Sequence, residues 1–295
     1  MMSGKRRLGG RIDSTETEGT VQVSIVVPMA RNRRDVGVVL QYAAAWARSV
    51  PWTVEMVIVD DGSGGRFDAE SASWRGAFDA LQVARHERPR GLGIAARTGL
   101  VSARGQYLIV VDPGVSTPLE NATALVESLA LGADVAVISR PRAGEVEGPG
   151  RPFLERAAET TFVAMTRLVC PVGVRDTLGG LVGLRRRAGR KIAERSHVAG
   201  RAFTIEWLAV AEWLGFQTTE CPQQWLDPRP RPHALLSASQ TAAVLRDLLR
   251  TRRRMAADDL EGPVSSREML SETRFVKLDR GTIPSHAVAR RVRGR

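Results

Sequence analysis

The chain has 295 residues, enough for one large domain or two small ones, and its 43% hydrophobic and 25% charged residues are ordinary globular values. No run of about 18 apolar residues occurs, which argues against a membrane-spanning helix. The formal charge of +11 favours partners that carry phosphate, namely nucleic acid, anionic lipid or small phosphorylated substrates. An arginine-rich codon preference explains the same bias equally well.

Targeting signals are not visible. Residues 1–20 are polar and glycine-rich with a basic Lys5-Arg6-Arg7, and they lack the apolar stretch of a signal peptide. The two cysteines, Cys170 and Cys221, have no metal-ligand spacing and are typical of buried thiols in a reducing compartment. We therefore expect a cytoplasmic protein.

Short apolar strands alternate with amphipathic helices before residue 140. The first strand covers residues 23–27, where Pro28 is expected to stop it. The next predicted elements are a helix capped by Asp35, a strand over 54–59, a helix over 67–78, a strand over 81–84, a helix over 91–103, a strand over 107–111, a helix capped by Thr117 and a strand over 134–138. Strands that are apolar on both faces and alternate with helices predict an α/β domain with a mostly parallel central sheet.

Beyond residue 140 the pattern is looser. Helices are predicted over 154–169 and 202–214, and a strand over 216–220. Residues 227–232 (Asp-Pro-Arg-Pro-Arg-Pro) form an extended linker, because proline removes backbone donors. The predicted organisation is a polar tail over 1–20, an α/β domain over 21–232, a basic amphipathic helix over 233–256 and a flexible charged tail over 257–295.

Three predicted strands end on polar residues, at Pro28, at Asp60-Asp61 and at Asp112. In parallel sheets ligands bind outside the carboxyl ends of the strands, so these residues are expected to meet at one edge. Paired carboxylates followed by Gly-Ser can accept hydrogen bonds from a ribose or a base, which predicts a nucleotide-type ligand. The local alternative is a turn in which Asp61 and Ser63 satisfy backbone donors.

Several motifs, in a fixed order, resemble glycosyltransferases of family 2. They are Val23-Ser-Ile-Val-Val-Pro28, Glu55-Met-Val-Ile-Val-Asp-Asp-Gly-Ser63, Gly91-Leu-Gly-Ile-Ala-Ala-Arg-Thr-Gly99, Ala103-Arg-Gly-Gln-Tyr107, Asp112-Pro-Gly-Val-Ser-Thr-Pro118, Ser139-Arg140, Asp176-Thr177, Phe203 to Glu206 and Glu220-Cys-Pro222. The ordered set covers about residues 22–250 and is most similar to the polyprenyl-phosphate (dolichyl-phosphate) glucosyl- and mannosyltransferases, which have the GT-A fold.

The resemblance implies transfer of a hexose, with inversion, from a nucleotide-diphosphate sugar to an acceptor such as polyprenyl phosphate. The residues that it implies for nucleotide-sugar binding are Pro28, Val59, Asp60, Asp61, Arg97, Asp112 and Ser139. It also implies catalytic roles for Asp112 at the diphosphate, Arg140 near the sugar, and Asp176 and Glu206 near the acceptor.

Five positions depart from the family pattern. The second aspartate of the Asp-x-Asp metal motif is Gly114, and the other departures are Arg31-Asn32 for Asn-Glu, Leu92 for lysine, Leu178-Gly179 for Gln-Cys and Thr204 for aspartate. Because Mg²⁺ is often held by one or two carboxylates with substrate phosphates and waters, Asp112 alone remains a candidate ligand for Mg²⁺ or Mn²⁺.

Two alternatives to this metal site follow from the same motif. Arginines at positions 90, 97 and 140 could balance the charge of a leaving diphosphate without a metal. Asp-Pro-Gly is also a good turn, which a catalytically silent relative that binds nucleotide sugars would retain.

Arginines that follow the predicted domain are candidate contacts for phosphate. Arg229 and Arg231 lie in the linker and are assigned to the acceptor phosphate. The basic helix carries Arg246, Arg250 and residues 252–254, which could meet the acceptor phosphate or the inner face of an anionic membrane. The plain alternative is a solvated helix face.

Two other classes of function fit the residues less well. Gly91-x-Gly93-x-x-Ala96 imitates a dinucleotide fingerprint, but residues 85–90 before it are charged and contain Pro89 instead of forming a strand. A nucleic-acid binder is supported by charge alone, because the basic residues are scattered and aromatic residues are just 5%.

Overall fold

The computed structural model describes residues 21–30, 36–112, 118–139, 153–170, 172–177, 180–223, 238–258, 266–271 and 273–276, with the backbone alone for 153–160, 238 and 266–268. None of their helices is both long and apolar enough to cross a bilayer.

The described strands form one sheet in the order β7-β5-β6-β4-β1-β2-β3-β8. Its strands are β1 (Val23–Ala30), β2 (Val54–Asp61), β3 (Ala80–His86), β4 (Tyr107–Val111), β5 (Val135–Ser139), β6 (Leu181–Arg185), β7 (Thr218–Pro222) and β8 (Arg274–Val276). The central four, β3-β2-β1-β4, are mutually parallel, and β5 is parallel to β7. β6 and β8 are antiparallel to their neighbours. The predicted mostly parallel α/β sheet is confirmed.

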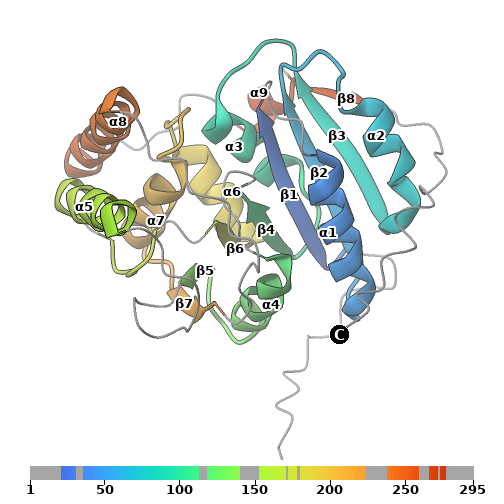
Figure 1. The fold of residues 1–295 in the computed structure, drawn as a ribbon, viewed down its shortest axis with the longest axis horizontal. Coiled ribbons are helices and arrows are strands. Elements are labelled where there is room, and N and C mark those ends of the chain that lie inside the picture. The colour runs from blue at the N-terminus through green and yellow to red at the C-terminus, as the bar shows by residue number, and fades with distance from the viewer. Residues whose placement is uncertain are drawn as a thin grey trace, which may run out of the picture.

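Helices cover both faces of this sheet, as Figure 1 shows. The helical segments are α1 (Val36–Ser49), α2 (Asp68–Ser73), η1 (Arg75–Ala77), α3 (Leu92–Ser102), η2 (Leu119–Asn121), α4 (Ala122–Ala130), α5 (Phe153–Val169), α6 (Arg186–Arg195), α7 (Phe203–Trp213), α8 (Ala238–Ala256) and α9 (Ser266–Ser271). Successive residues of β1 face opposite sides, because side chains of a strand alternate. Val26 packs in the core with α3 and α7, whereas Ile25 and Val27 pack in the core with α1 and α4.

Several boundaries differ from the sequence-based expectation. Pro28 does not end β1, which continues to Ala30. The pairing of β1 with β4 stops at Val26, so beyond that point only β2 is paired with it and a missing donor is tolerated. β6 and α6 are not predicted from the sequence, and β7 lies two residues later than predicted. The predicted caps Asp35 and Thr117 lie outside the described residues.

The expectation of a flexible tail after residue 256 is wrong for part of that segment. α9 packs against α3 and α6, and β8 pairs with the edge strand β3, where Phe275 lies opposite Ala84. The predicted end of the α/β domain at residue 232 is therefore too early, because the sheet takes its last strand from the C-terminal region.

A buried carboxylate links three parallel strands at the amino edge of the sheet. Glu55 of β2 is fully buried and accepts hydrogen bonds from Ser24 Oγ (2.6 Å) in β1 and Gln82 Nε2 (3.2 Å) in β3. The backbone N–H and Nε of Arg104 donate to the same carboxylate at 2.9 and 2.8 Å. Its charge is thus matched by four donors, which is the condition for burying a carboxylate without a large cost.

We expect Glu55→Gln to destabilise the fold by about 3 kcal/mol, because it removes a fully buried charge that accepts hydrogen bonds from the buried Ser24 hydroxyl and from the backbone N–H of Arg104. Urea denaturation measures the effect. Glu87→Gln, at an exposed position, is the matched control and should change stability by less than about 0.5 kcal/mol. Equal effects of the two substitutions would contradict the structural role of Glu55.

Candidate functional site

The polar strand ends predicted from the sequence meet at the carboxyl edge of the sheet. In the register of β1 and β2, Pro28 lies beside Val59 and Ala30 beside Asp61. β4 runs on the other side of β1 and ends just before Asp112, whose backbone N–H donates to the carbonyl oxygen of Gly180 (2.9 Å). The parallel core of the sheet therefore brings these three strand ends to one edge, as expected.

Asp60 is engaged within the protein. Its carboxylate is fully buried and accepts hydrogen bonds from the backbone N–H of Ser63 (2.8 Å) and from Nε of Arg85 (2.8 Å). Arg85 lies beside Asp60 on β3 and also pairs with Asp68 of α2. The hydrogen bond from Ser63 N–H to Asp60 stabilises the turn after β2. The role of Asp60 in nucleotide binding stays a prediction.

Asp61 holds the segment that leads into α3. One carboxylate oxygen accepts hydrogen bonds from the backbone N–H of Arg90 (2.8 Å) and lies 2.8 Å from Nδ1 of His86, and the other accepts from Gly91 N–H (2.9 Å). Nε2 of His86 lies 2.9 Å from the hydroxyl of Thr98. Burial alone would raise the pKa of Asp61, but the hydrogen bonds from His86 and the two backbone N–H groups outweigh it and hold this pKa below its usual value.

The start of α3 packs closely on the segment 196–200. Gly93 N–H donates to the carbonyl oxygen of Ala199 (2.8 Å), and a Cβ on Gly93 would lie 2.1 Å from the carbonyl oxygen of Val198. Gly91 has φ +105°, in the region that favours glycine. The glycines of this motif therefore serve close backbone packing here, which explains the pattern that imitates a dinucleotide fingerprint.

Arg97 and Glu206 are buried side chains of opposite charge near that segment. Glu206, in α7, is only 1% exposed, and its carboxylate accepts from the backbone N–H of His197 (2.8 Å) and Val198 (3.0 Å). Burial raises the pKa of Glu206, and these hydrogen bonds and the charge of Arg97 oppose that shift. Burial lowers the pKa of Arg97 to about 10, and the Glu206 charge opposes it. Nε of Arg97 donates to the carbonyl oxygen of Ala193 (2.9 Å).

Asp112 and Asp176 differ from the other predicted carboxylates because both are partly exposed. The backbone N–H of Asp176 donates to Glu220 of β7 (3.1 Å), and Arg175 pairs with the same glutamate (Nε to oxygen, 2.9 Å). β7 lies beside β5, which ends at Ser139, itself only 6% exposed. A carboxylate must reach solvent to meet a substrate, so Asp112 and Asp176 are the better placed of the predicted acidic residues.

Some predicted residues cannot be placed. Arg140, Arg229, Arg231 and Gly114 lie outside the described residues. Within the described part of the chain, no group of three or more His, Cys, Asp or Glu side chains could hold a metal ion. A single carboxylate such as Asp112 fits Mg²⁺ or Mn²⁺ when phosphate oxygens of a substrate and waters supply the other ligands.

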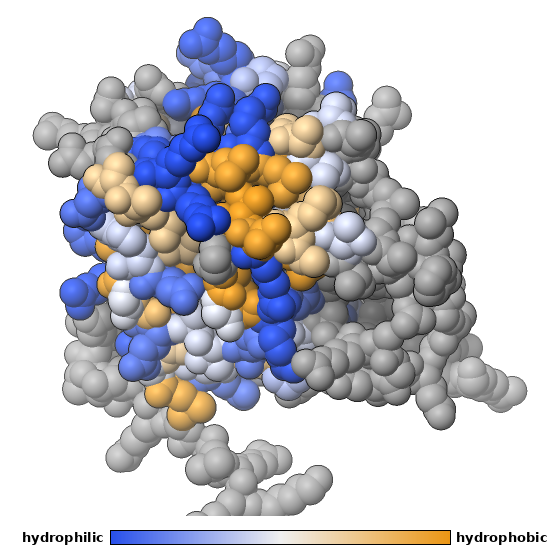
Figure 2. Space-filling view, turned by 90° about the vertical axis from the view of Figure 1, so that its left-hand side faces the viewer, coloured by the Kyte–Doolittle hydropathy of each residue, from blue (hydrophilic) through white to orange (hydrophobic). Residues whose placement is uncertain are grey.

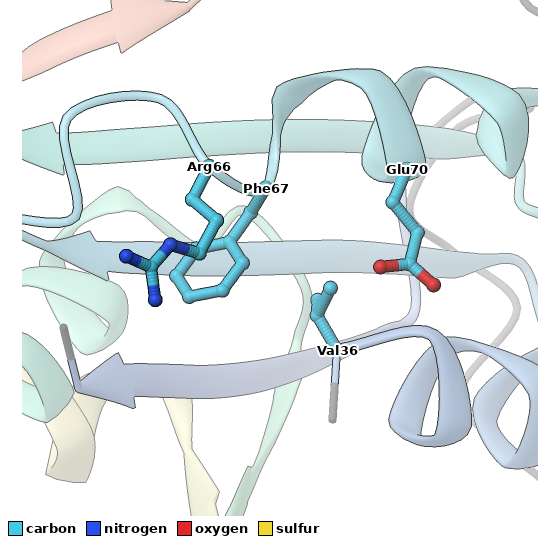
Figure 3. Close-up of a pocket in the computed structure, with 4 residues that line it drawn as sticks. All are labelled: Val36, Arg66, Phe67 and Glu70. Atoms are coloured by element: carbon cyan, nitrogen blue, oxygen red, sulfur yellow. The ribbon is translucent and has the colours of Figure 1, made fainter. Parts of the chain in front are cut away.

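A small pocket of about 260 Å³ lies between the start of α1 and the turn after β2, lined by Val36, Arg66, Phe67 and Glu70. Figure 3 shows the Arg66 guanidinium on the side of the strand ends and the Glu70 carboxylate at the opposite end, above α1. This pocket was not predicted from the sequence, because its residues come from the start of α1 and from the turn and helix after β2, which are distant in sequence.

Arg85 and His86, which contact Asp60 and Asp61, are not among the site residues predicted from the sequence. The expected strand ended at residue 84, whereas β3 runs to His86. A two-residue extension beside β2 would have placed a basic pair opposite the acidic pair, since the parallel register sets Asp60 against Arg85 and Asp61 against His86.

We expect Gly93→Ala to destabilise the protein by about 1–3 kcal/mol, because the new methyl group would overlap the carbonyl oxygen of Val198. Gly173→Ala is the matched control, since the nearest atom to its Cβ would be 3.7 Å away. Thermal or urea unfolding compares the two. Equal stability of both variants would contradict the packing described for α3.

The stability that Asp61 contributes should depend on pH. Because its pKa is depressed in the folded state, its stabilisation is present above the unfolded-state value of about 3.9 and is lost as the pH falls through the folded-state pKa. The difference in unfolding free energy between wild type and Asp61→Asn should therefore be largest near neutral pH and shrink below about pH 4. Exposed Glu127→Gln serves as the control. A difference that stays constant between neutral and acid pH would sink this assignment.

Known proteins resemble this chain in sequence and in fold. Residues 24–192 match the model of glycosyl transferase family 2. The human dolichyl-phosphate beta-glucosyltransferase is 24% identical over 225 residues, covering 70% of this chain and 68% of that protein. The dolichol-phosphate mannosyltransferase of Pyrococcus furiosus is 25% identical over 169 residues, covering 56% and 47%.

Solved structures with a similar fold are sugar transferases with the GT-A architecture. Glucosyl-3-phosphoglycerate synthase from Mycobacterium tuberculosis matches with a TM-score of 0.56 at 20% identity, covering 79% of this chain and 80% of that chain. Mannosyl-3-phosphoglycerate synthase from Rubrobacter xylanophilus matches with a TM-score of 0.57 at 18% identity, covering 81% and 76%. A structure of the mycobacterial enzyme contains Mn²⁺, uridine diphosphate and phosphoglyceric acid.

The predicted GT-A fold and the predicted hexosyltransferase class are thereby confirmed at the level of the family. The match covers more than half of the sequence and includes the strand ends around Asp61 and Asp112. This chain belongs to glycosyl transferase family 2.

Proposed function

We propose that the protein transfers a hexose from a nucleotide-diphosphate sugar to polyprenyl phosphate, with inversion at the anomeric carbon. The observation that carries the proposal is the partly exposed Asp112 at the carboxyl edge of the sheet, the edge where β1 and β2 also end, in a member of this family. The names of the relatives support the class of acceptor, because several of them act on dolichyl phosphate.

In this proposal the acceptor is its own nucleophile. A phosphate monoester has a second pKa of about 6, so it is largely a dianion at neutral pH and needs no strong general base. One phosphate oxygen attacks the anomeric carbon while the bond from that carbon to the donor diphosphate breaks, and the nucleoside diphosphate leaves. The buried, hydrogen-bonded Glu206 and the threonine at position 204 are compatible with such a reaction, because neither has to remove a proton.

Charge on the leaving diphosphate is the main electrostatic demand of this reaction. We assign Asp112 to hold Mg²⁺ or Mn²⁺ jointly with the donor phosphates, and the metal would neutralise the leaving group. Arg90 lies near the buried Arg97, and the charges of both contribute at the edge where α3 begins. Arg140 is assigned to the same role from the sequence alone.

The donor nucleotide is assigned to the edge formed by Pro28, Val59, Asp60 and Asp61, with Ser139 near the diphosphate. We assign Asp176 to the acceptor side, and the sequence alone assigns the linker arginines Arg229 and Arg231 to the acceptor phosphate. Because polyprenyl phosphate is a lipid, we place the protein peripherally at the cytoplasmic face of a membrane. The second candidate function, nucleotide-sugar binding without turnover, is favoured by Gly114 at the position of the second metal carboxylate.

A donor screen tests the proposal. Purified protein is mixed with polyprenyl phosphate and UDP- or GDP-hexoses, with and without Mn²⁺, and release of nucleoside diphosphate is measured. We expect release with at least one donor and a loss of roughly 100-fold or more in Asp112→Ala. Asp134→Ala, a partly exposed aspartate at the opposite edge of the sheet, should retain activity. Tight binding of UDP or GDP without release from any donor would support the silent alternative.

Gly114→Asp restores the second carboxylate of the metal motif and separates the two charge-balancing mechanisms. If Asp112 holds the metal, this variant should reach half-maximal release at a lower Mn²⁺ concentration than wild type, because a second carboxylate strengthens a Mg²⁺ or Mn²⁺ site. Release that is unchanged by chelation in wild type, and unaffected by Gly114→Asp, would assign charge balance to the arginines instead.

A further inference from the structure

Two helices, α5 and α8, lie side by side at the end of the molecule farthest from β8 (Figure 1). Nη1 of Arg252 donates to the carbonyl oxygens of Leu168 (3.2 Å) and Val169 (3.4 Å), so the last turns of α8 hold the end of α5. We call eight of the exposed residues of this pair the α5–α8 face: Thr161, Ala164, Leu168, Ala242, Arg246, Leu249, Arg250 and Arg253.

This face exposes large apolar side chains. Leu168 is 78% exposed and Leu249 is 41% exposed. Figure 2, which looks at this side of the molecule, shows an apolar patch bordered by hydrophilic residues. Single exposed leucines are common, but apolar residues gathered on one side and rimmed by charge mark a surface that meets a partner.

The charge on the same face is almost entirely positive. The side chains of Arg246 and Arg250 are 62% and 67% exposed, and Arg253 is exposed as well. Asp247 approaches the first two at 3.9 and 3.6 Å, which are long contacts worth little in water. No acidic residue occurs between positions 161 and 170 of α5. The partner must therefore offer both an apolar phase and negative charge.

We propose that the α5–α8 face docks on a membrane surface that contains anionic lipid. Leucines would enter the boundary between head groups and acyl chains, while arginines meet the lipid phosphates. A second copy of this chain fits poorly, because a symmetric contact would bring the same arginines together. Nucleic acid also fits poorly, because the face has no aromatic residue on which bases could stack.

The face is connected to the acceptor side of the site. Thr251 of α8 lies 3.5 Å from a carboxylate oxygen of Glu206, and the segment 172–177 with Asp176 follows α5 shortly after its end. A membrane docked here would present a lipid-borne acceptor next to that segment. The inference deepens the proposed function in this respect, but docking itself requires neither donor nor turnover.

Co-sedimentation with vesicles tests the proposal, using the full chain without donor sugar. We expect binding to vesicles of phosphatidylcholine mixed with phosphatidylglycerol, and little binding to phosphatidylcholine alone. Each arginine near an anionic surface contributes about fivefold to partitioning, so Arg246→Glu with Arg250→Glu should weaken binding by about thirtyfold or more. Leu168→Ser with Leu249→Ser should weaken it at least about tenfold.

Matched controls come from other parts of the surface. Arg187→Glu with Arg190→Glu alters two exposed arginines of α6, and Leu131→Ser alters an 80% exposed leucine after α4. Both should bind vesicles as wild type does, and circular dichroism checks that every variant is folded. Equal binding to neutral vesicles, or an equal loss in the α6 pair, would overturn the proposal.

Two further outcomes would also overturn it. A wild-type dimer in light scattering that Leu168→Ser with Leu249→Ser converts to a monomer would assign the face to a second copy. Absence of vesicle binding at low salt would reject the membrane altogether, whatever the donor screen shows. Conversely, vesicle binding that depends on this face together with no sugar release would leave the docking surface intact and reject only the transfer reaction.

Discussion

Hydrogen bonds to the buried carboxylate of Asp61 hold together the carboxyl edge of the sheet. This carboxylate lies at the end of β2, contacts His86 at the end of β3, and receives the backbone N–H groups of Arg90 and Gly91. A single buried group thus fixes two strand ends and the entry of α3. Because the start of α3 in turn packs on residues 196–200, which Glu206 holds from below, the constraint extends from the predicted donor side to the predicted acceptor side.

The carboxylates of the site fall into two groups with different physical roles. Asp60, Asp61 and Glu206 are buried, and their oxygens accept hydrogen bonds from backbone or basic groups of the protein. These carboxylates therefore stabilise the local fold. Asp112 and Asp176 are partly exposed and come from the segments that follow β4 and α5. When the acceptor is already an anion, the reaction requires charge balance at the diphosphate more than removal of a proton. A family member can therefore function with only the partly exposed carboxylates facing the substrates.

α5 and α8 form an outer layer of helices that has a buried side and a solvent-exposed side. Toward the interior, Val244 and Leu248 are buried in the core with α7, and Thr251 reaches Glu206. Toward the exterior, leucine and arginine side chains remain in contact with solvent. The exposed side chains are therefore not constrained by packing in the core, while the buried ones keep α8 in a fixed position relative to α7 and Glu206.

Sequence alone determined the alternation of apolar strands and helices, the parallel core and the edge where Pro28, Asp61 and Asp112 meet, because side-chain periodicity is local and strand ends of a parallel sheet coincide. It did not reveal α6, where three of the four buried residues are alanine or glycine and arginines surround them, nor β8, whose three residues show no buried position. Only the tertiary structure decided that Arg85 and His86 contact the aspartate pair and that Glu206 is buried. These outcomes depend on register and packing between distant segments, which a local pattern does not encode.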